Sequence, residues 1–244
     1  MFKHNWLKAD WPAASHVYAA TTLRSGGVST APYESWNMGL HTGDNPQHVQ
    51  QNRQRLGLPT EPFWLQQVHG QRVIEAEQHE QTLQEADAAY TRAGNTICAV
   101  MTADCLPVLF CDAKGQQVAA VHAGWRGLAA GILDNTVRQF NAAPETLLAW
   151  LGPAISQSAY EVGDEVRQVF TTYDAEMATA FKAGKKNHWW MDIYALARLN
   201  LARLGVEQVY GGNACTYNEK EKFFSFRRDG ETGRMVSVIW FETP

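Results

Sequence analysis

The sequence predicts an α+β (mixed α/β) fold organised as a single domain over residues 1–244. Strand-like and helix-like segments are mixed along the chain without strict β-α-β alternation. The 244 residues, 45% of them hydrophobic, are enough to bury the core of one large domain. The chain shows no internal repeat, low-complexity tract or Pro/Ser-rich linker, so no boundary divides it into two domains.

Composition argues against several classes of protein. The net charge is −4, with no basic surplus or basic run, so we expect binding neither to nucleic acid nor to a membrane surface. No apolar run approaches the about 20 residues of a transmembrane helix, and the N-terminal stretch 1–6 lacks the apolar core of a secretory signal. We interpret the four cysteines as reduced thiols. These features predict a cytoplasmic protein.

The first third of the chain predicts strands separated by polar loops. We expect strands over 16–23, 62–70 and 73–76, a helix over 47–56, and loops over 24–29, 35–46 and 77–85. Two adjacent glycines follow Arg24, which suits a loop whose backbone N–H groups face an anion and equally a plain turn. The strand at 62–70 ends at His69, where Gly70 lets the chain turn and exposes the imidazole. Asp87 lies among small residues, so we expect a buried carboxylate with a structural role.

The segment 98–127 is the centre of the predicted fold. Two apolar runs flank the polar turn at 112–116, which is typical of a buried β-hairpin. If the strands pair directly across this turn, Pro107 lies opposite His122, and Cys105 is one or two residues away. The hairpin therefore predicts a thiol and an imidazole at the same strand end, directly before a helix.

The last part of the chain predicts alternating helices and strands. We expect helices over 128–140, 165–173 and 192–204, strands over 147–151, 206–210 and 235–241, and a loop over 174–188. The apolar side chains of 128–140 recur at helical spacing, and 147–151 is a continuous apolar run, as in a buried strand. Asp192 is a suitable N-cap for its helix and Gly205 a suitable stop.

Three chemistry-bearing side chains are predicted at strand ends, and they allow three interpretations. Two imidazoles and a thiolate, from His69, His122 and Cys105, leave a fourth tetrahedral position open, as in catalytic zinc sites. Alternatively, Cys105 is a nucleophile with His122 as its base and Asp104 or Asp87 as the orienting group. The third interpretation is plain packing, because cysteine is often buried and a core histidine can simply be hydrogen-bonded. The sequence pattern leaves all three open.

Three arginines on separate loops are candidates for binding phosphate or carboxylate. Arg24 follows the first strand, Arg126 lies at a predicted helix start where free N–H groups favour anions, and Arg228 lies near the C-terminus. Each one alone is more often a surface ion pair.

A set of motifs resembles a known family over about residues 20–240. The motifs are Thr22–Ser29, Asn37–Leu40, Gln67–Gly70, Thr102–Val108, His122–Gly127, Leu151–Ile155, Tyr160–Gly163 and Phe224–Arg228. Together they resemble the YfiH-like family, which is also called the laccase-domain or multicopper polyphenol oxidase family. The most specific parts are Thr102–Val108 and His122–Gly127.

The resemblance implies both a fold and an activity. The implied fold is a single domain with mixed β-sheets packed between layers of helices. The implied metal, usually zinc and alternatively copper, is held by His69, Cys105 and His122. The implied activity is phosphorolysis of purine nucleosides (adenosine, inosine, guanosine, methylthioadenosine) with adenosine deamination in the same pocket. The partners would then be a purine nucleoside and phosphate. Other members are described as copper-dependent polyphenol oxidases or are linked to peptidoglycan-precursor editing.

The residues favour nucleoside chemistry over phenol oxidation. Four-electron reduction of oxygen is hard to run at one copper centre, and the chain shows no further histidine cluster beside His69 and His122. We therefore expect a zinc-dependent purine nucleoside phosphorylase that also deaminates adenosine. Asp104 would carry a proton or orient a ligand, and Asn37 would contact the substrate together with the three arginines.

Two alternatives remain open. One is a hydrolase or amidase of cell-wall precursors that uses the same metal or Cys105 as nucleophile. The other is a metal-binding interaction module without catalytic activity. We expect a monomer or a small homo-oligomer.

Overall fold

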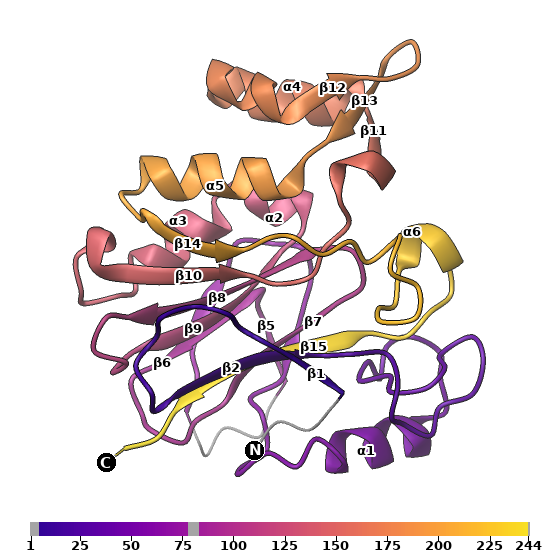
Figure 1. The fold of residues 1–244 in the computed structure, drawn as a ribbon, viewed down its shortest axis with the longest axis vertical. Coiled ribbons are helices and arrows are strands. Elements are labelled where there is room, and N and C mark those ends of the chain that lie inside the picture. The colour runs from indigo at the N-terminus through magenta and orange to yellow at the C-terminus, as the bar shows by residue number, and fades with distance from the viewer. Residues whose placement is uncertain (1–4, 78–82, 244) are drawn as a thin grey trace.

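The computed structural model describes residues 5–77 and 83–243. Residues 1–4, 78–82 and 244 lie outside the described residues, and with them much of the N-terminal stretch and of the predicted loop at 77–85. Figure 1 shows two stacked β-sheets with helices on both sides, α5, α2 and α3 above and α1 below. The predicted α+β fold, with mixed sheets packed between helices, is confirmed.

The larger sheet has six strands in the order β14-β10-β8-β9-β6-β4. Its strands are β4 (Val73–Glu75), β6 (Ala88–Thr91), β8 (Leu106–Asp112), β9 (Val118–Ala123), β10 (Leu147–Leu151) and β14 (Gln208–Gly211). The pairs β10·β14 and β4·β6 are parallel and the other pairs are antiparallel. Every residue of β6, β8, β9 and β10 is buried, which explains their continuous apolar runs.

The second sheet has four antiparallel strands in the order β1-β2-β15-β7. These are β1 (Trp6–Lys8), β2 (Val17–Thr22), β7 (Cys98–Thr102) and β15 (Met235–Phe241). It packs on the first sheet through an apolar layer that includes Val100 and Ile239 on one side and Leu109 and Val118 on the other. The core of the molecule therefore lies between two sheets and is closed by helices.

The predicted hairpin is present as β8 and β9. Pro107 lies opposite His122, and the Asp112 N–H donates to the Gln117 carbonyl at 3.1 Å, so the register predicted from the turn is confirmed. The preceding segment, β7, belongs to the other sheet. The chain crosses between the sheets at residues 103–105, where Asp104 has a φ of 89°.

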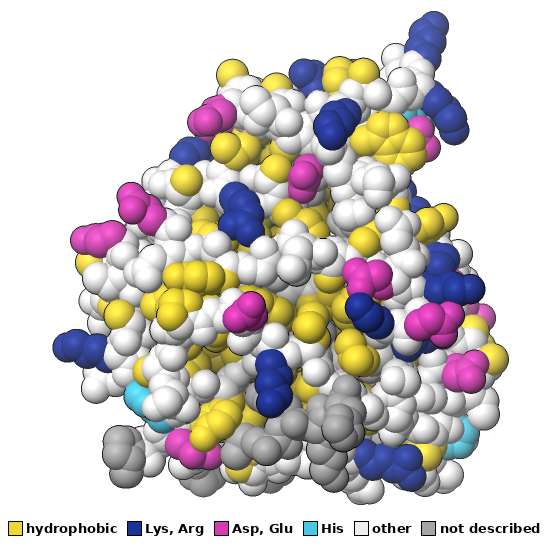
Figure 2. Space-filling view, in the orientation of Figure 1, with side chains coloured by type: hydrophobic (Ala, Val, Ile, Leu, Met, Phe, Trp, Pro, Cys, Tyr) yellow, Lys and Arg dark blue, Asp and Glu magenta, His cyan; other side chains and the backbone are white. Residues whose placement is uncertain are grey.

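Helices cover both outer faces. They are α1 (Pro46–Gln54), α2 (Trp125–Ala130), α3 (Ile132–Val137), α4 (Asp164–Tyr173), α5 (Ile193–Arg203) and α6 (Phe226–Asp229), with 3₁₀ turns η1 (Pro144–Thr146), η2 (Gln157–Ala159) and η3 (Ala175–Ala180). α2, α3 and α5 pack on the six-stranded sheet through residues such as Leu128, Leu133 and Leu196. None of the described helices is long and apolar enough to span a bilayer. On the face drawn in Figure 2, basic and acidic side chains are interspersed.

Three predicted elements differ from the structure. The helix expected at 128–140 is two short helices, because Gly131 adopts a φ of 90°, which interrupts helical hydrogen bonding. The loop expected at 174–188 contains η3 and the strand β12 (Phe181–Ala183) and leads into β13 (His188–Met191). With β11 (Glu161–Gly163), these strands form a three-stranded sheet. The strand expected at 62–70 is reduced to β3 (Leu65–Gln66), paired in parallel with β5 (Gln84–Glu85).

Candidate metal centre and its pocket

The structure brings His69, Cys105 and His122 together. One ligand atom from each lies within 4.8 Å of the others. The Cys105 Sγ is 3.8 Å from the His69 Nε2, and the two imidazole rings are 4.7 Å apart at a near-perpendicular angle of 78°. His122 is buried, while the other two side chains reach the surface of a pocket. These are the three residues that the sequence placed at strand ends.

The three residues come from two parts of the fold. His122 lies in β9, and Cys105 directly precedes β8, so the hairpin register brings both to one end. His69 does not end a strand as expected; its φ of 60° places it in a tight turn. Because Gly124 has no side chain, it leaves room for the side chains of Cys105 and His69. A Cβ at this position would lie 3.0 Å from the Cys105 Sγ and 3.1 Å from the His69 Cδ2.

Asp87 connects the two histidines. Its Oδ1 accepts the His122 Nδ1–H at 2.7 Å and the His69 backbone N–H at 2.9 Å. Its Oδ2 accepts the backbone N–H of Gly70 at 2.6 Å and of Val68 at 3.2 Å. The carboxylate therefore holds the turn that carries His69 and leaves Nε2 of His122 as the ring nitrogen that interacts with Cys105. The sequence predicted a structural role for Asp87 and did not connect it to His69.

The electrostatics of the cluster favour a thiolate. Burial raises the pKa of the Cys105 thiol, but the charge and hydrogen bond of His122, with a further contribution from His69, outweigh it and lower the pKa to about 6. Burial lowers the pKa of His122, yet the Cys105 thiolate and Asp87 together raise it to about 9. By contrast, burial raises the pKa of Cys111 to about 12 and also raises that of Cys98, so these two thiols are inert.

The donor set fits a metal ion. A thiolate and two neutral imidazole nitrogens are zinc ligands, and three of them leave one coordination position open. A bound metal would displace the proton that the raised pKa of His122 holds on its ring at neutral pH. The same set is also found in copper sites. The Asp87–His122 contact is the outer partner that metal-bound histidines normally have. Across residues 5–77 and 83–243, this is the one group of at least three His, Cys, Asp or Glu residues close enough to share an ion.

The cluster opens into a cavity of about 330 Å³. It is lined by His41, Gln67, His69, Met101, Thr102, Ala103, Asp104, Cys105, His122, Ile155, Tyr160, Phe226, Arg227 and Arg234. Four lining residues were not among the candidates expected from the sequence, namely Tyr160, Phe226, Arg227 and Arg234, although the first three lie in the family motifs. Arg234 and His41 lie outside those motifs, and no sequence pattern marked them.

Asp104 lies in this lining but its carboxylate is already engaged. Oδ1 accepts the Thr216 hydroxyl at 2.6 Å, and Oδ2 accepts the Arg227 backbone N–H at 2.6 Å. The Asp104 carbonyl also accepts the Ile155 N–H at 3.0 Å. The carboxylate thus ties the 216–227 segment to the candidate metal centre. Of the two roles expected for Asp104, these contacts favour orientation over proton transfer.

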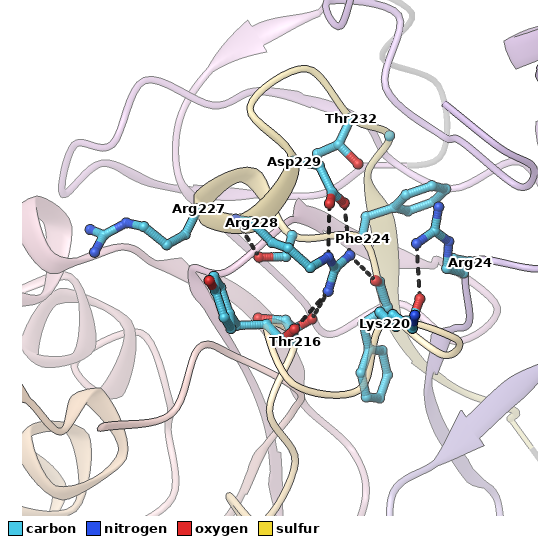
Figure 3. A network of polar contacts seen from close by, with 12 residues as sticks. Arg24, Thr216, Lys220, Phe224, Arg227, Arg228, Asp229 and Thr232 are labelled. Atoms are coloured by element: carbon cyan, nitrogen blue, oxygen red, sulfur yellow. Dashed lines mark hydrogen bonds and ion pairs between the residues drawn. The ribbon is translucent and has the colours of Figure 1, made fainter. Parts of the chain in front are cut away.

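The structure does not bring Arg24, Arg126 and Arg228 together as one anion site. Figure 3 shows Arg228 inside a polar network. Its guanidinium donates to the carbonyls of Thr216, Tyr217 and Phe223 and pairs with Asp229 at 2.7 Å. Three backbone carbonyls and the Asp229 carboxylate engage all the N–H donors of this guanidinium, and the expected binding of substrate by Arg228 stays a prediction.

Arg24 and Asn37 also have structural partners. The Arg24 guanidinium donates to the carbonyls of Glu34 and Lys220 and lies over the Phe224 ring. Asn37 is fully buried, and its side-chain carbonyl accepts the backbone N–H of Gly39 and of Arg234. Neither side chain is in the described cavity lining, and their expected contact with substrate stays a prediction.

Arg126 is also outside the described cavity lining, but its charge acts on a residue of that lining. It is the second residue of α2, is exposed and covers the ring of its neighbour Trp125. Its charge acts on Tyr160 in the cavity lining, where Arg126 and Arg227 both oppose the rise in the pKa of the phenol that burial and the Cys105 thiolate produce. Arg126 therefore adds positive potential near the Tyr160 side of the cavity.

Two named relatives match almost the full length of the chain. It is 54% identical over 236 residues to the Escherichia coli protein named purine nucleoside phosphorylase YfiH, covering 95% of this chain and 96% of the relative. It is 50% identical over 242 residues to a Haemophilus influenzae protein named purine nucleoside phosphorylase, covering 97% and 99%.

Solved structures share the fold. A Neisseria meningitidis protein superposes with a TM-score of 0.94 at 50% identity, over 98% of this chain and 100% of that one. YlmD from Geobacillus stearothermophilus superposes with a TM-score of 0.93 at 30% identity, over 100% and 98%. The family model described as multi-copper polyphenol oxidoreductase laccase matches residues 18–242. The chain belongs to this multi-copper polyphenol oxidoreductase laccase family.

Proposed function

We propose that this protein is a cytoplasmic, zinc-dependent purine nucleoside phosphorylase that also deaminates adenosine. The observation that carries the proposal is the His69–Cys105–His122 cluster at the base of a cavity with aromatic and cationic walls. The names of the relatives that are 50% and 54% identical support the phosphorylase assignment. The substrates would be adenosine, inosine, guanosine or methylthioadenosine, together with phosphate.

His69, Cys105 and His122 would hold the metal. Zinc bound there would supply a Lewis acid that polarises a polar group of the substrate. Asp87 keeps the His122 Nδ1–H engaged, so that the opposite ring nitrogen faces the cavity. The low pKa of Cys105 keeps the sulfur in its ligand form at neutral pH.

The cavity walls suit a nucleoside. Phe226 is 58% exposed although its side chain is large and apolar, and it offers a ring face on which a purine can stack. Tyr160 is partly buried and also lines the cavity. The volume of about 330 Å³ is in the range of small-molecule pockets.

We favour nucleoside chemistry over phenol oxidation because of the number of metal-ligating side chains that the described residues bring together. Among the described residues, a single three-donor cluster is present. Reduction of oxygen to water takes four electrons, whereas phosphorolysis and deamination need none. A single redox-inactive zinc is sufficient for both of the proposed reactions.

The test combines metal analysis with product analysis. Protein purified without added metal should contain about one zinc per chain, as a three-donor catalytic site holds a single ion. In the presence of phosphate, inosine should be cleaved to hypoxanthine and ribose 1-phosphate. Adenosine should in addition be deaminated by water to inosine and ammonia. An absence of turnover of all four nucleosides, with cleavage of peptidoglycan precursors instead, would replace the proposal with the cell-wall alternative. Oxidation of phenols at a copper-loaded centre would replace it with the oxidase.

A further inference from the structure

We propose that Arg227 and Arg234 form the phosphate subsite of this cavity, next to Phe226. The inference rests on the proposed phosphorylase function and assigns the anion-binding role to a different pair of arginines from those expected from the sequence.

Arg227 points away from the network that binds its neighbour. Figure 3 shows the side chains of Arg227 and Arg228 extending in opposite directions from α6. The Arg227 Nη1 donates to the Glu161 carbonyl at 2.9 Å, and the guanidinium lies 5.2 Å from the centre of the Tyr160 ring. The side chain lines the cavity, and these two contacts fix its direction.

Arg234 approaches the cavity from the start of β15. Its Nη1 donates to the carbonyls of Thr232 and Gly233 at 2.9 and 3.0 Å, and its guanidinium lies 5.8 Å from the centre of the Phe226 ring. The backbone N–H of Arg234 is held by Asn37. A Cβ on Gly39 would lie 2.9 Å from the Arg234 Cγ, so the Asn37–Gly39 motif makes room for this arginine.

Neither guanidinium has a carboxylate partner among the described ion pairs. Asp104 is the one carboxylate in the described lining of the cavity, and both of its oxygens accept other hydrogen bonds. Burial lowers the pKa of Arg234, because a buried cation is costly, although the Cys105 thiolate and Asp104 act on this pKa in the opposite direction. A bound anion would offset that cost.

Phosphate fits such a pair of cations. Guanidinium groups bind phosphate oxygens through paired, charge-assisted hydrogen bonds. In the reaction, a phosphate oxygen forms a bond to C1′ of the ribose, and the bond between C1′ and the purine nitrogen breaks. The electron pair of that bond stays on the purine, which takes up the proton brought by the hydrogen phosphate. The products are the free base and ribose 1-phosphate.

The test is direct binding of inorganic phosphate to the metal-loaded protein by titration calorimetry. The variants are Arg227→Gln and Arg234→Gln. The matched control is Arg198→Gln, because Arg198 also donates only to backbone carbonyls, those of Val209 and Gly211, and lies outside the described cavity lining. Circular dichroism and a thermal melt verify that each variant is folded.

We expect each pocket variant to raise the Kd of phosphate by about tenfold or more, as loss of a charge-assisted hydrogen bond predicts, and Arg198→Gln to leave it unchanged. In turnover, KM for phosphate should rise in the pocket variants by a larger factor than KM for inosine. Wild-type affinity in either pocket variant, or no phosphate binding by the wild-type protein, would overturn the subsite. If phosphate binds through both arginines but no ribose 1-phosphate forms, the subsite stands and the phosphorylase proposal fails.

Discussion

The Oδ1 of Asp87 lies 2.7 Å from the Nδ1 of His122 and 2.9 Å from the backbone nitrogen of His69. One buried carboxylate thus orients one imidazole and holds the turn that carries the other. Because both histidines depend on it, the geometry of the candidate metal centre depends on Asp87 as much as on the three proposed ligands.

We predict that Asp87→Asn weakens metal binding by about 10- to 100-fold, the usual effect of removing an outer partner of a metal-bound histidine. Competition with a zinc chelator measures it. The matched control is Asp112→Asn, because Asp112 is also buried and also accepts two backbone N–H groups. It lies at the turn of the β8–β9 hairpin, at the opposite end from Cys105 and His122. Equal metal affinity in wild type and Asp87→Asn would contradict the orienting role.

Metal-free protein should show an unusually acidic cysteine. The thiolate fraction grows as pH rises through the pKa, so alkylation of Cys105 by iodoacetamide should reach half its maximal rate near pH 6, where its pKa lies. An ordinary thiol does so near pH 8.5. The Cys105→Ser variant should lose the fast reaction, since burial raises the pKa of both Cys98 and Cys111. A midpoint above pH 8 would contradict the thiolate–imidazolium pairing.

Asp104→Asn should lower kcat/KM by about tenfold while metal content stays at the wild-type level. Asparagine tolerates the positive φ of this position, so the change acts on the contacts to Thr216 and the Arg227 backbone, which are worth about 1–3 kcal/mol when charged. Thr216→Val should have a similar effect, because it removes one of the same contacts. If Asp104 instead transfers a proton, Asp104→Asn alone would remove one limb of the pH–rate profile.

Phe226→Ala should raise KM for inosine, because base stacking on an aromatic ring contributes about 1–3 kcal/mol. The melting temperature should hardly change, since the side chain is 58% exposed. Tyr173→Ala is the control, an aromatic residue that is 63% exposed and outside the described lining of the cavity. An unchanged KM would remove Phe226 from the binding site.

The hairpin and its register followed from the sequence because they are local. Two apolar runs and a turn containing Gly115, whose φ is 64°, leave one pairing that buries both strands, and that pairing places Cys105 near His122. Helix α5, with Asp192 as N-cap accepting the Ala195 N–H, was predictable for the same reason.

The other features depend on contacts between distant segments. The position of His69 is set by a left-handed turn anchored on Asp87, 18 residues away, which no apolar pattern reveals. Arg227 and Arg228 are neighbours with the same side chain, yet one faces the cavity and the other is bonded to loop carbonyls. The strands β12 and β13 were missed because their turn is rich in lysine and glycine.

The most direct test of the central claim is the turnover of inosine by wild type, Cys105→Ala and Cys111→Ala in the presence and absence of phosphate. We predict phosphate-dependent release of hypoxanthine with an equal amount of ribose 1-phosphate in wild type and Cys111→Ala. In Cys105→Ala, both turnover and bound metal should be lost. Full activity or full metal occupancy in Cys105→Ala, or no phosphate-dependent cleavage by the wild-type protein, would contradict the account.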